Sequence, residues 1–464
     1  FLSKIFRESL MSASLPPDWL TARIMPIHKN GDRSSVGNYR PISLTCSSCK
    51  LIEHIVANHI VQILNTNSAL SPCQHGFRKG FSTVTQLTTA IHTFSAVLDR
   101  SGQVDVIYLD FSKAFDRVPH NKLLLKLKII GVPAPLIKWI AAYLQHRSQY
   151  VEIDGFSSSP LEVTSGVPQG SVLGPLLFLV YINDLVSSID ENVNVNLFAD
   201  DCMLFKEIRS LSDQILLNDA LNDVSSWCNK LGMSLKLQKT VFMHITRKKL
   251  PQTFNYTLIS TSVTQVTKYK YLGVIINDQL TWSDHICHIT SSAMKKLGFL
   301  RHKLRGAPSN VKKLAYESIV RPKLEYAAVV WDPHTKKDIA QVEKVQRRAV
   351  RFIYNKYRNS DSPSLLMQIN QIKPLCIRRK IARIEFLHCL LQGKFGISAT
   401  PYVTPSSTRK TRHTHKYSLT PHFAKTSSHK FSFFPKTICD WNLLPEDVLT
   451  CDNFKNTINN IFNH

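Results

Sequence analysis

The sequence of 464 residues contains no apolar run long enough to cross a lipid bilayer. Its longest apolar stretch covers only residues 175–182. The N-terminus lacks the charged region followed by an apolar core that marks a secretory signal. The first methionine is Met11, so we expect the sequence to be part of a longer open reading frame. These absences predict a protein that neither spans a membrane nor is secreted.

Cysteines are present, but they lack the regular spacing of a disulfide framework. The ten cysteines are scattered along the chain, which suits a reducing compartment. One local pattern, formed by Cys46, Cys49, His54 and His59, has the spacing of a retroviral-type zinc knuckle. The apolar residues between these ligands recur at helical spacing, whereas a knuckle needs a glycine-rich, non-helical loop. We therefore expect a helix here and no zinc site.

Acidic residues are scarce relative to basic ones. The chain has 33 Asp and Glu against 58 Lys and Arg, a formal net charge of +25. The excess is concentrated in residues 285–464, which hold 31 basic and 11 acidic side chains, whereas residues 1–284 hold 27 and 22. A one-sided basic region predicts a polyanion-binding surface. Nucleic acid is the leading candidate and an anionic membrane surface is the second.

The chain is too long for one compact core, so we expect two to four subdomains, and no internal repeat is visible. Strands are predicted at 104–110 and at a hairpin over 149–166. A helix is predicted over 211–231, and a basic helical region over 284–395. Residues 398–437 are rich in Ser, Thr, Pro and His, which predicts a loop or a partly disordered linker.

Two adjacent carboxylates, Asp200 and Asp201, interrupt an apolar run that otherwise predicts strands. Because an unpaired buried carboxylate is costly, the pair is either a turn between two strands or lies against something positive. Asp110 ends another predicted strand. Three carboxylates brought together would repel one another unless cations lie between them. Mg²⁺ is the natural partner, and two ions roughly 3.5–4 Å apart can clamp both oxygens of a phosphoryl transfer.

A third motif, SGVPQGSVLGP, spaces Gly166, Gly170 and Gly174 four residues apart. Glycine at such positions lets the backbone approach a ligand closely, or it simply makes turns. Taken singly, each motif has a commoner interpretation: a surface turn for the Asp pair, a strand-end cap for Asp110 and a loop for the glycines. Their occurrence together and in this order favours a functional site.

The order of these motifs resembles the reverse transcriptases of non-LTR (LINE-type) retrotransposons. The matching stretches are LDFSKAFD at 109–116, GVPQGS at 166–171 and FADD at 198–201, with further similarity in PDWLTARIMPIHKNGD, NYRPISLT, QHGFRKGFST, LGMSLKLQKT, YLGVII and TICDWNLLPEDV. The resemblance implies an α+β right-hand polymerase with fingers, an antiparallel-sheet palm and a helical thumb. It places a connecting helix and fingers in 1–103, the palm with finger insertions in 104–283, the basic thumb and its extension in 284–395, and a linker with a small C-terminal module in 396–464.

The implied activity is that of an RNA-directed DNA polymerase, a nucleotidyltransferase that extends a DNA primer on an RNA template with dNTPs. Two Mg²⁺ ions, or Mn²⁺ in their place, would serve as cofactors. The resemblance makes Asp110, Asp200 and Asp201 the catalytic, metal-binding carboxylates and places Phe111 at the metal and dNTP sites. Lys239 matches a candidate acid for the departing pyrophosphate.

The remaining implied roles concern the dNTP and the nucleic acid. Phe115 would stack under the sugar and exclude a 2′-OH, although a core aromatic is an equal interpretation of this residue type. Basic residues of the fingers and thumb would pair with phosphates. The expected dNTP-binding set is Lys29, Arg40, Phe111, Phe115, Gln169 and Gly170, and the expected nucleic-acid-binding set is Lys295, Lys296, Arg301, Lys303 and Arg305. A later cluster, Arg378, Arg379, Lys380 and Arg383, is expected to track the phosphates as well.

Basic runs at 246–249 and 409–416 fit nuclear localisation signals or RNA contacts, although such runs are commonly solvated loops. We expect a ribonucleoprotein of the nucleus and cytoplasm. The alternative function is that of a decayed element copy, a non-catalytic RNA-binding remnant. The three intact acidic positions and the uninterrupted frame favour the polymerase.

Overall fold

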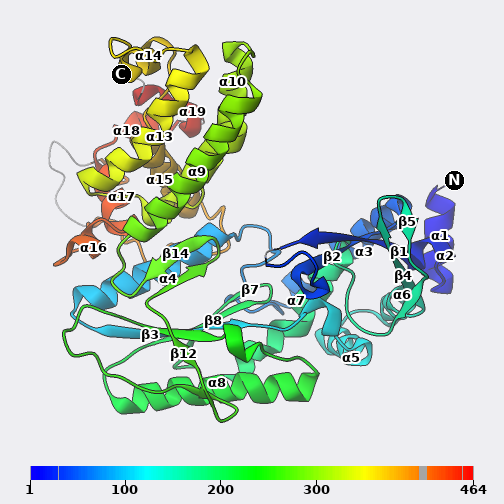
Figure 1. Cartoon of the computed structure of the whole chain (residues 1–464). Coiled ribbons are helices and arrows are strands. Elements are labelled where there is room, and N and C mark those ends of the chain that lie inside the picture. The colour runs from blue at the N-terminus through cyan, green and yellow to red at the C-terminus, as the bar shows by residue number, and fades with distance from the viewer. Residues whose placement is uncertain (1, 30, 407–414, 452, 463–464) are drawn as a thin grey trace.

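The computed structural model describes residues 2–29, 31–406, 415–451 and 453–462. Figure 1 shows a central sheet, with a bundle of helices rising from one end of it and a second, smaller sheet with its own helices at the other. The expected right-hand α+β architecture is confirmed, with palm, thumb and fingers in these three places. Most of the basic run at 409–416 lies outside the described residues.

The palm is a five-stranded sheet whose central strand is buried on both faces. Val106 and Tyr108 of this strand pack toward helix α4, while Ile107 and Leu109 pack toward helix α8. Figure 1 shows these two helices on opposite sides of the sheet. Burial on both faces explains the nearly continuous apolar sequence of the strand. In spatial order the strands are β12 (Thr264–Gln265), β9 (Val241–Thr246), β3 (Gln103–Asp110), β8 (Asp201–Glu207) and β7 (Asn194–Phe198), and the helices are α4 (Thr83–Asp99) and α8 (Leu211–Leu231).

The fingers combine a short mixed sheet with helices from two separate stretches of the chain. Residues 149–166, expected to form a hairpin, contain the hairpin of β4 and β5 and a further short strand, β6, that also pairs with β4. Strand β1 joins β2 on one side and β4 on the other. The elements are β1 (Thr21–His28), β2 (Tyr39–Leu44), β4 (Arg147–Ile153), β5 (Phe156–Ser157) and β6 (Leu161–Val163), with α1 (Leu2–Ser12), α2 (Pro17–Leu20), α3 (Ser47–Thr66), α5 (His120–Ile130), α6 (Ala134–Leu144) and α7 (Leu173–Ile182).

Helix α3 carries the cysteine and histidine pattern considered above as a zinc knuckle. Cys49 is buried on its inner face, whereas His54 and His59 are exposed on the outer face. The four side chains therefore do not converge, as the helical spacing predicts.

The thumb is a helical bundle that follows the hairpin of β13 and β14. Helices α9 and α13 lie side by side along its length, and together with α4 and the palm sheet they enclose one core. No helix in the described part of the chain is long and apolar enough to cross a membrane. The elements are β13 (Lys268–Tyr271), β14 (Val274–Asn277), α9 (Ser283–Lys303), α10 (Ser309–Ala315), α11 (Arg321–Glu325), α12 (Ala328–Trp331), α13 (Lys336–Tyr354) and α14 (Pro363–Ile369).

The C-terminal region shares one core with α15, so the boundary expected at residue 396 falls inside a packed unit. Val403 and Leu419, within the stretch expected to be a linker, are buried in this core. Asp99 of α4 accepts hydrogen bonds from the backbone N–H groups of Lys425 and Thr426, which ties the segment to the palm. The helices are α15 (Leu375–Leu391), α16 (Ser427–Lys430), α17 (Phe433–Asn442), α18 (Glu446–Leu449) and α19 (Phe454–Ile461).

Candidate active site

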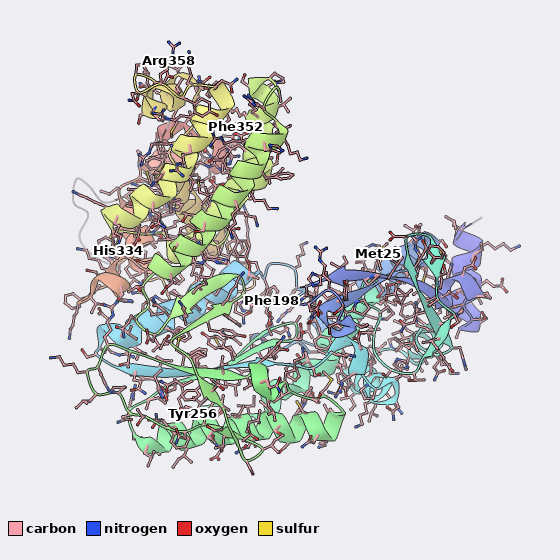
Figure 2. The ribbon with its side chains drawn as sticks, in the orientation of Figure 1. Met25, Phe198, Tyr256, His334, Phe352 and Arg358 are labelled. Carbon is pink, nitrogen blue, oxygen red and sulfur yellow. The ribbon has the colours of Figure 1, made fainter. Side chains whose placement is uncertain are left out.

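The palm sheet brings the three predicted carboxylates to one edge. Asp110, the last residue of β3, lies directly opposite Asp201, the first residue of β8. Asp201 in turn pairs with Phe198 across a two-residue turn that contains Asp200. Directly opposed residues of antiparallel strands have Cα atoms roughly 4.5–5.5 Å apart. Figure 2 labels Phe198, which marks this turn where the palm meets the fingers.

The turn that carries Asp200 is held in a strained conformation by a glutamine. Ala199 has φ of +55°, a left-handed conformation that is costly for a residue with a Cβ. The buried Gln74 accepts a hydrogen bond from the Ala199 N–H (2.9 Å) and donates one to its carbonyl oxygen (3.3 Å). A Cβ on Gly76 would overlap the Ala199 nitrogen, so only glycine fits there. Sequence reasoning noted the QHGFRKG stretch but missed this role of Gln74.

The carboxylates perturb one another. Loss of hydration, followed by repulsion from Asp200 and Asp110, raises the pKa of Asp201 to about 6. Burial, with repulsion from Asp110, also raises the pKa of Asp200. Asp201 nevertheless keeps contact with solvent, and Asp110 and Asp200 are half-buried. An acidic cluster that is crowded yet accessible can be relieved by a cation from solution.

Basic side chains surround this cluster. The Lys236 ammonium lies 3.2 Å from one oxygen of Asp110, and that of Lys239 lies 3.8 Å from the other. From the fingers, Lys29 and Arg40 act on the same carboxylates, since each favours the ionised form of Asp200. Burial, followed by repulsion from Arg40 and Lys236, lowers the pKa of Lys29. The contact of Lys236 was missed, although its sequence signal is a second lysine three positions before Lys239.

The carboxylate oxygens suit a hard divalent cation, but they do not yet converge on one binding position. In the described part of the chain, no group of three or more His, Cys, Asp and Glu side chains is already arranged to hold a metal ion. The Lys236 ammonium takes the place beside Asp110 that such an ion would need. Carboxylate oxygens are nonetheless the ligands that Mg²⁺ prefers. The residues therefore fit the ion chemically, provided that Asp110 exchanges Lys236 for it.

Comparison with known proteins decides the family. A family model described as "Reverse transcriptase (RNA-dependent DNA polymerase)" matches residues 27–276, the fingers and palm. This chain belongs to the reverse transcriptase family. The resemblance inferred from the motifs is thereby confirmed.

Two curated relatives from Drosophila melanogaster bear the names of RNA-directed DNA polymerases of a transposon and a mobile element. "Probable RNA-directed DNA polymerase from transposon BS" is 30% identical over 365 residues, which cover 76% of this chain and 40% of the relative. "RNA-directed DNA polymerase from mobile element jockey" is 30% identical over 369 residues, with the same coverage of 76% and 40%. The chain thus spans about 40% of the length of these relatives. Apo telomerase from Candida Tropicalis aligns with 12% identity and a TM-score of 0.45 over 82% of this chain and 66% of that one, a similarity too low to relate individual residues.

The two phenylalanines of the first reverse transcriptase motif have different environments. The Phe111 ring is buried in the core, edge-on to Trp227, so only its backbone can face a ligand at the site. Phe115 is partly exposed and stacks on Phe178 with ring centroids 4.3 Å apart. Phe77 approaches Phe115 edge-on at 6.3 Å. Phe115 is thus neither a core aromatic nor a free surface ring.

The glycine-rich loop of the reverse transcriptase docks onto the fingers. The Gln169 carbonyl oxygen accepts a hydrogen bond from the Ser43 N–H (2.7 Å), and its side chain donates to Asp116 (3.2 Å). Gly170 has φ of +123°, and a Cβ there would overlap the Ser43 carbonyl oxygen. Glu53, another residue that sequence reasoning missed, accepts hydrogen bonds from the N–H groups of Val172 and Leu173 at the start of α7. This loop therefore fixes the fingers against the palm.

The basic residues expected to contact nucleic acid fall into two classes. Those of α9 and the turn after it are exposed on the thumb. Arg379 and Arg383 of the later cluster are instead buried and paired with Asp332, at 2.7 and 3.0 Å, so they cannot track phosphates. That expectation is wrong because charge spacing on a helix does not reveal a buried partner 47 residues away in sequence. The exposed set is Lys295, Lys296, Arg301, Lys303 and Arg305.

Proposed function

We propose that this chain is an RNA-directed DNA polymerase that extends a DNA primer on an RNA template with dNTPs. The observation that carries the proposal is the pairing of Asp110 with Asp201, beside Asp200, under basic residues of the fingers. Membership of the reverse transcriptase family and the names of the relatives support this activity. Family membership likewise supports binding of an RNA template. No observation favours a decayed, non-catalytic copy.

The reverse transcriptase family is generally dependent on divalent metal ions. Asp110, Asp200 and Asp201, with the backbone of Phe111, would hold Mg²⁺ or Mn²⁺. When bound, such an ion acts as a Lewis acid on the phosphoryl oxygens. The clustering that raises the pKa of Asp201 is the physical reason for the cluster to accept a cation.

The other side chains of the site would bind and orient the substrate. Lys29 and Arg40 offer charge-assisted hydrogen bonds to the triphosphate. Phe115, fixed by Phe178, would limit the space beside C2′ of the sugar. The Gln169–Gly170 loop would lie against the new base pair. Lys239 would donate a proton to the leaving pyrophosphate.

Lys295 and Lys296 of α9, which are exposed, would hold the template–primer duplex through its phosphates, without reading sequence. We also propose that the protein works in a ribonucleoprotein that is present in the nucleus and the cytoplasm.

A primer-extension assay on poly(rA)/oligo(dT), with and without a chelator, tests the proposed activity. We expect extension that requires a divalent ion, and a loss of roughly 10³-fold or more in Asp200→Asn, with RNA binding retained. Asp190→Asn, an exposed change in the turn before β7, is the matched control and should extend primers normally. RNA binding by the wild-type protein without any extension would instead support the non-catalytic remnant.

A further inference from the structure

A cleft of about 520 Å³ opens at the end of the thumb that is remote from the palm. Its lining includes Gly298 and Arg301 of α9, Arg305 in the turn after that helix, and Tyr357 after α13. Figure 2 places Phe352, also in the lining, near the free end of the thumb, whereas Phe198 marks the carboxylates at its base. Arg301 lies 18 residues beyond the start of α9, about 27 Å along the helix axis. The cleft is therefore separate from the polymerase centre.

The cleft contains a buried ammonium that no anion neutralises. Lys312 is only 1% exposed, and its Nζ donates a hydrogen bond to Asn355 Oδ1 (3.0 Å) and lies 5.4 Å from the centre of the Phe352 ring. Among the residues that the structure describes, no carboxylate lies within 4.0 Å of the charged groups of Lys312, Arg301 or Arg305. Burying an unpaired charge is costly. An anion from outside the chain would complete this cluster.

The cleft also offers an aromatic surface and open space. Tyr357 is half-exposed, and the Arg301 guanidinium lies 5.5 Å from the centre of its ring. Cations beside accessible aromatic rings are the usual means of binding single-stranded nucleic acid, since the rings stack on unpaired bases. Gly298 lies in the interior of α9, where glycine weakens a helix. A Cβ at this position would meet nothing within 4 Å, so the glycine leaves the cleft open rather than serving to pack against a neighbour.

We propose that this cleft binds a backbone phosphate of single-stranded RNA, with the adjacent base stacked on Tyr357. The phosphate lies against Lys312, Arg301 and Arg305, and a second strand would block the stacking face. The choice of RNA rests on the proposed function, in which RNA is the template. The position of the cleft assigns it to a stretch of RNA outside the duplex held at the palm.

Fluorescence anisotropy with the full chain and a labelled 12-nucleotide oligo(A) RNA tests this assignment. Chelator is present, so the result does not depend on polymerase activity. Gly298→Leu fills the cleft without removing a charge, and Arg301→Gln removes one cation. We expect each change to weaken binding at least fivefold, and Arg301→Gln to reduce the salt slope by about 0.7. Lys337→Gln removes an exposed charge on α13 outside the cleft and should bind like the wild type.

Three comparisons separate the cleft from general charge attraction. An RNA–DNA hybrid should bind Gly298→Leu as tightly as the wild type, and Tyr357→Ala should lose affinity for oligo(A) but not for an abasic strand. Equal weakening of hybrid and single strand would overturn the proposal, because the cleft would then belong to the duplex path. Displacement of the oligomer by AMP at equal phosphate concentration would also overturn it, in favour of a free-nucleotide site. Unfolding temperatures confirm that each variant is folded.

Discussion

The molecule contains two carboxylate clusters whose pKa values are shifted in opposite directions. In the palm, loss of hydration and mutual repulsion raise the pKa of Asp200 and Asp201. In the C-terminal core, burial alone would raise the pKa of Asp332, but Arg383, Lys436 and Arg379 outweigh it and hold the pKa below its usual range. Asp332 is more deeply buried than Asp200 and Asp201. Burial alone therefore does not decide whether the pKa of a carboxyl group is raised or lowered; the neighbouring charges decide it.

The two clusters differ in whether the chain itself supplies the cations that neutralise them. Asp332 receives all its cations from the chain, at 2.6 to 3.0 Å, and holds α12, α15 and α17 together. In the palm, Lys236 and Lys239 approach only Asp110, at 3.2 and 3.8 Å, and the Asp pair has no ion-pair partner among the described residues. A buried cluster whose charges are satisfied within the fold is costly to break, because removal of one partner leaves the others as unpaired buried charges. A cluster whose negative charge the chain does not neutralise can instead bind a cation from solution.

The largest expected effect comes from breaking the satisfied cluster. Asp332→Asn leaves Arg379 and Lys436 without a carboxylate in a buried site, and Arg383 with Asp440 alone, so we expect a loss of about 3–5 kcal/mol in the free energy of unfolding. Chemical denaturation measures this loss. Asp200→Asn is the matched change in the palm and should not lower stability, because it removes a repelled charge. Similar losses in both variants would contradict the distinction between the two clusters.

Substitution of an aromatic residue should affect substrate selection in the palm and stability in the C-terminal core. Phe115→Val opens space beside the proposed sugar position, so we expect discrimination against ribonucleotides to fall by roughly 10- to 200-fold, the range for a change of pocket size. Incorporation of rNTPs relative to dNTPs measures it. Trp441→Val, in the C-terminal core, should lower stability and leave sugar selection unchanged. Unchanged selection in Phe115→Val would show that the ring only packs against Phe178.

Substitution of Gln74 tests whether catalysis depends on the conformation of the turn that carries Asp200. Gln74→Met removes both hydrogen bonds to Ala199 at similar volume, so we expect kcat to fall about tenfold while KM for dNTP changes little. Gln74→Glu keeps the acceptor oxygen and should recover part of kcat. Gln86→Met is the control, because it removes a buried glutamine that bonds Tyr271 instead of the turn. An equal loss of kcat in Gln86→Met would show that Gln74 contributes only packing and does not act through the turn.

The sequence allows prediction of the elements that carry the carboxylates, but not of the contacts that hold them. Alternation and the apolar runs around Asp110, Asp200 and Asp201 identify strands and their ends, and the register then follows from the fold. Gln74 acts on Ala199 from 125 residues away, and Lys236 acts on Asp110 from 126. Such pairings depend on how loops dock, which periodicity does not encode.

The same limit explains the misassigned arginines. A helix with Arg379 and Arg383 four residues apart predicts an exposed basic stripe as readily as a buried ion-pair face. The deciding residue, Asp332, lies at the end of a different helix, after the apolar residues 327–331, and nothing in that stretch indicates that its partners are on α15. Charge counts thus locate a basic region correctly but overstate how much of it faces a ligand.

The smallest expected effect concerns the incomplete cluster itself. The pKa of Asp201 is raised to about 6, so the folded state binds a proton more tightly than the unfolded chain, and this stabilisation is lost as the pH rises through about 6. A divalent ion replaces the lost proton only when the carboxylates are ionised. We therefore expect Mg²⁺ at ten times its dissociation constant to add about 1.4 kcal/mol at pH 7.5, a rise in Tm on the order of 2 °C, and much less at pH 5. In Asp201→Asn, the Mg²⁺ effect on Tm should disappear at both pH values; an equal rise in the variant and the wild type would place the ion elsewhere.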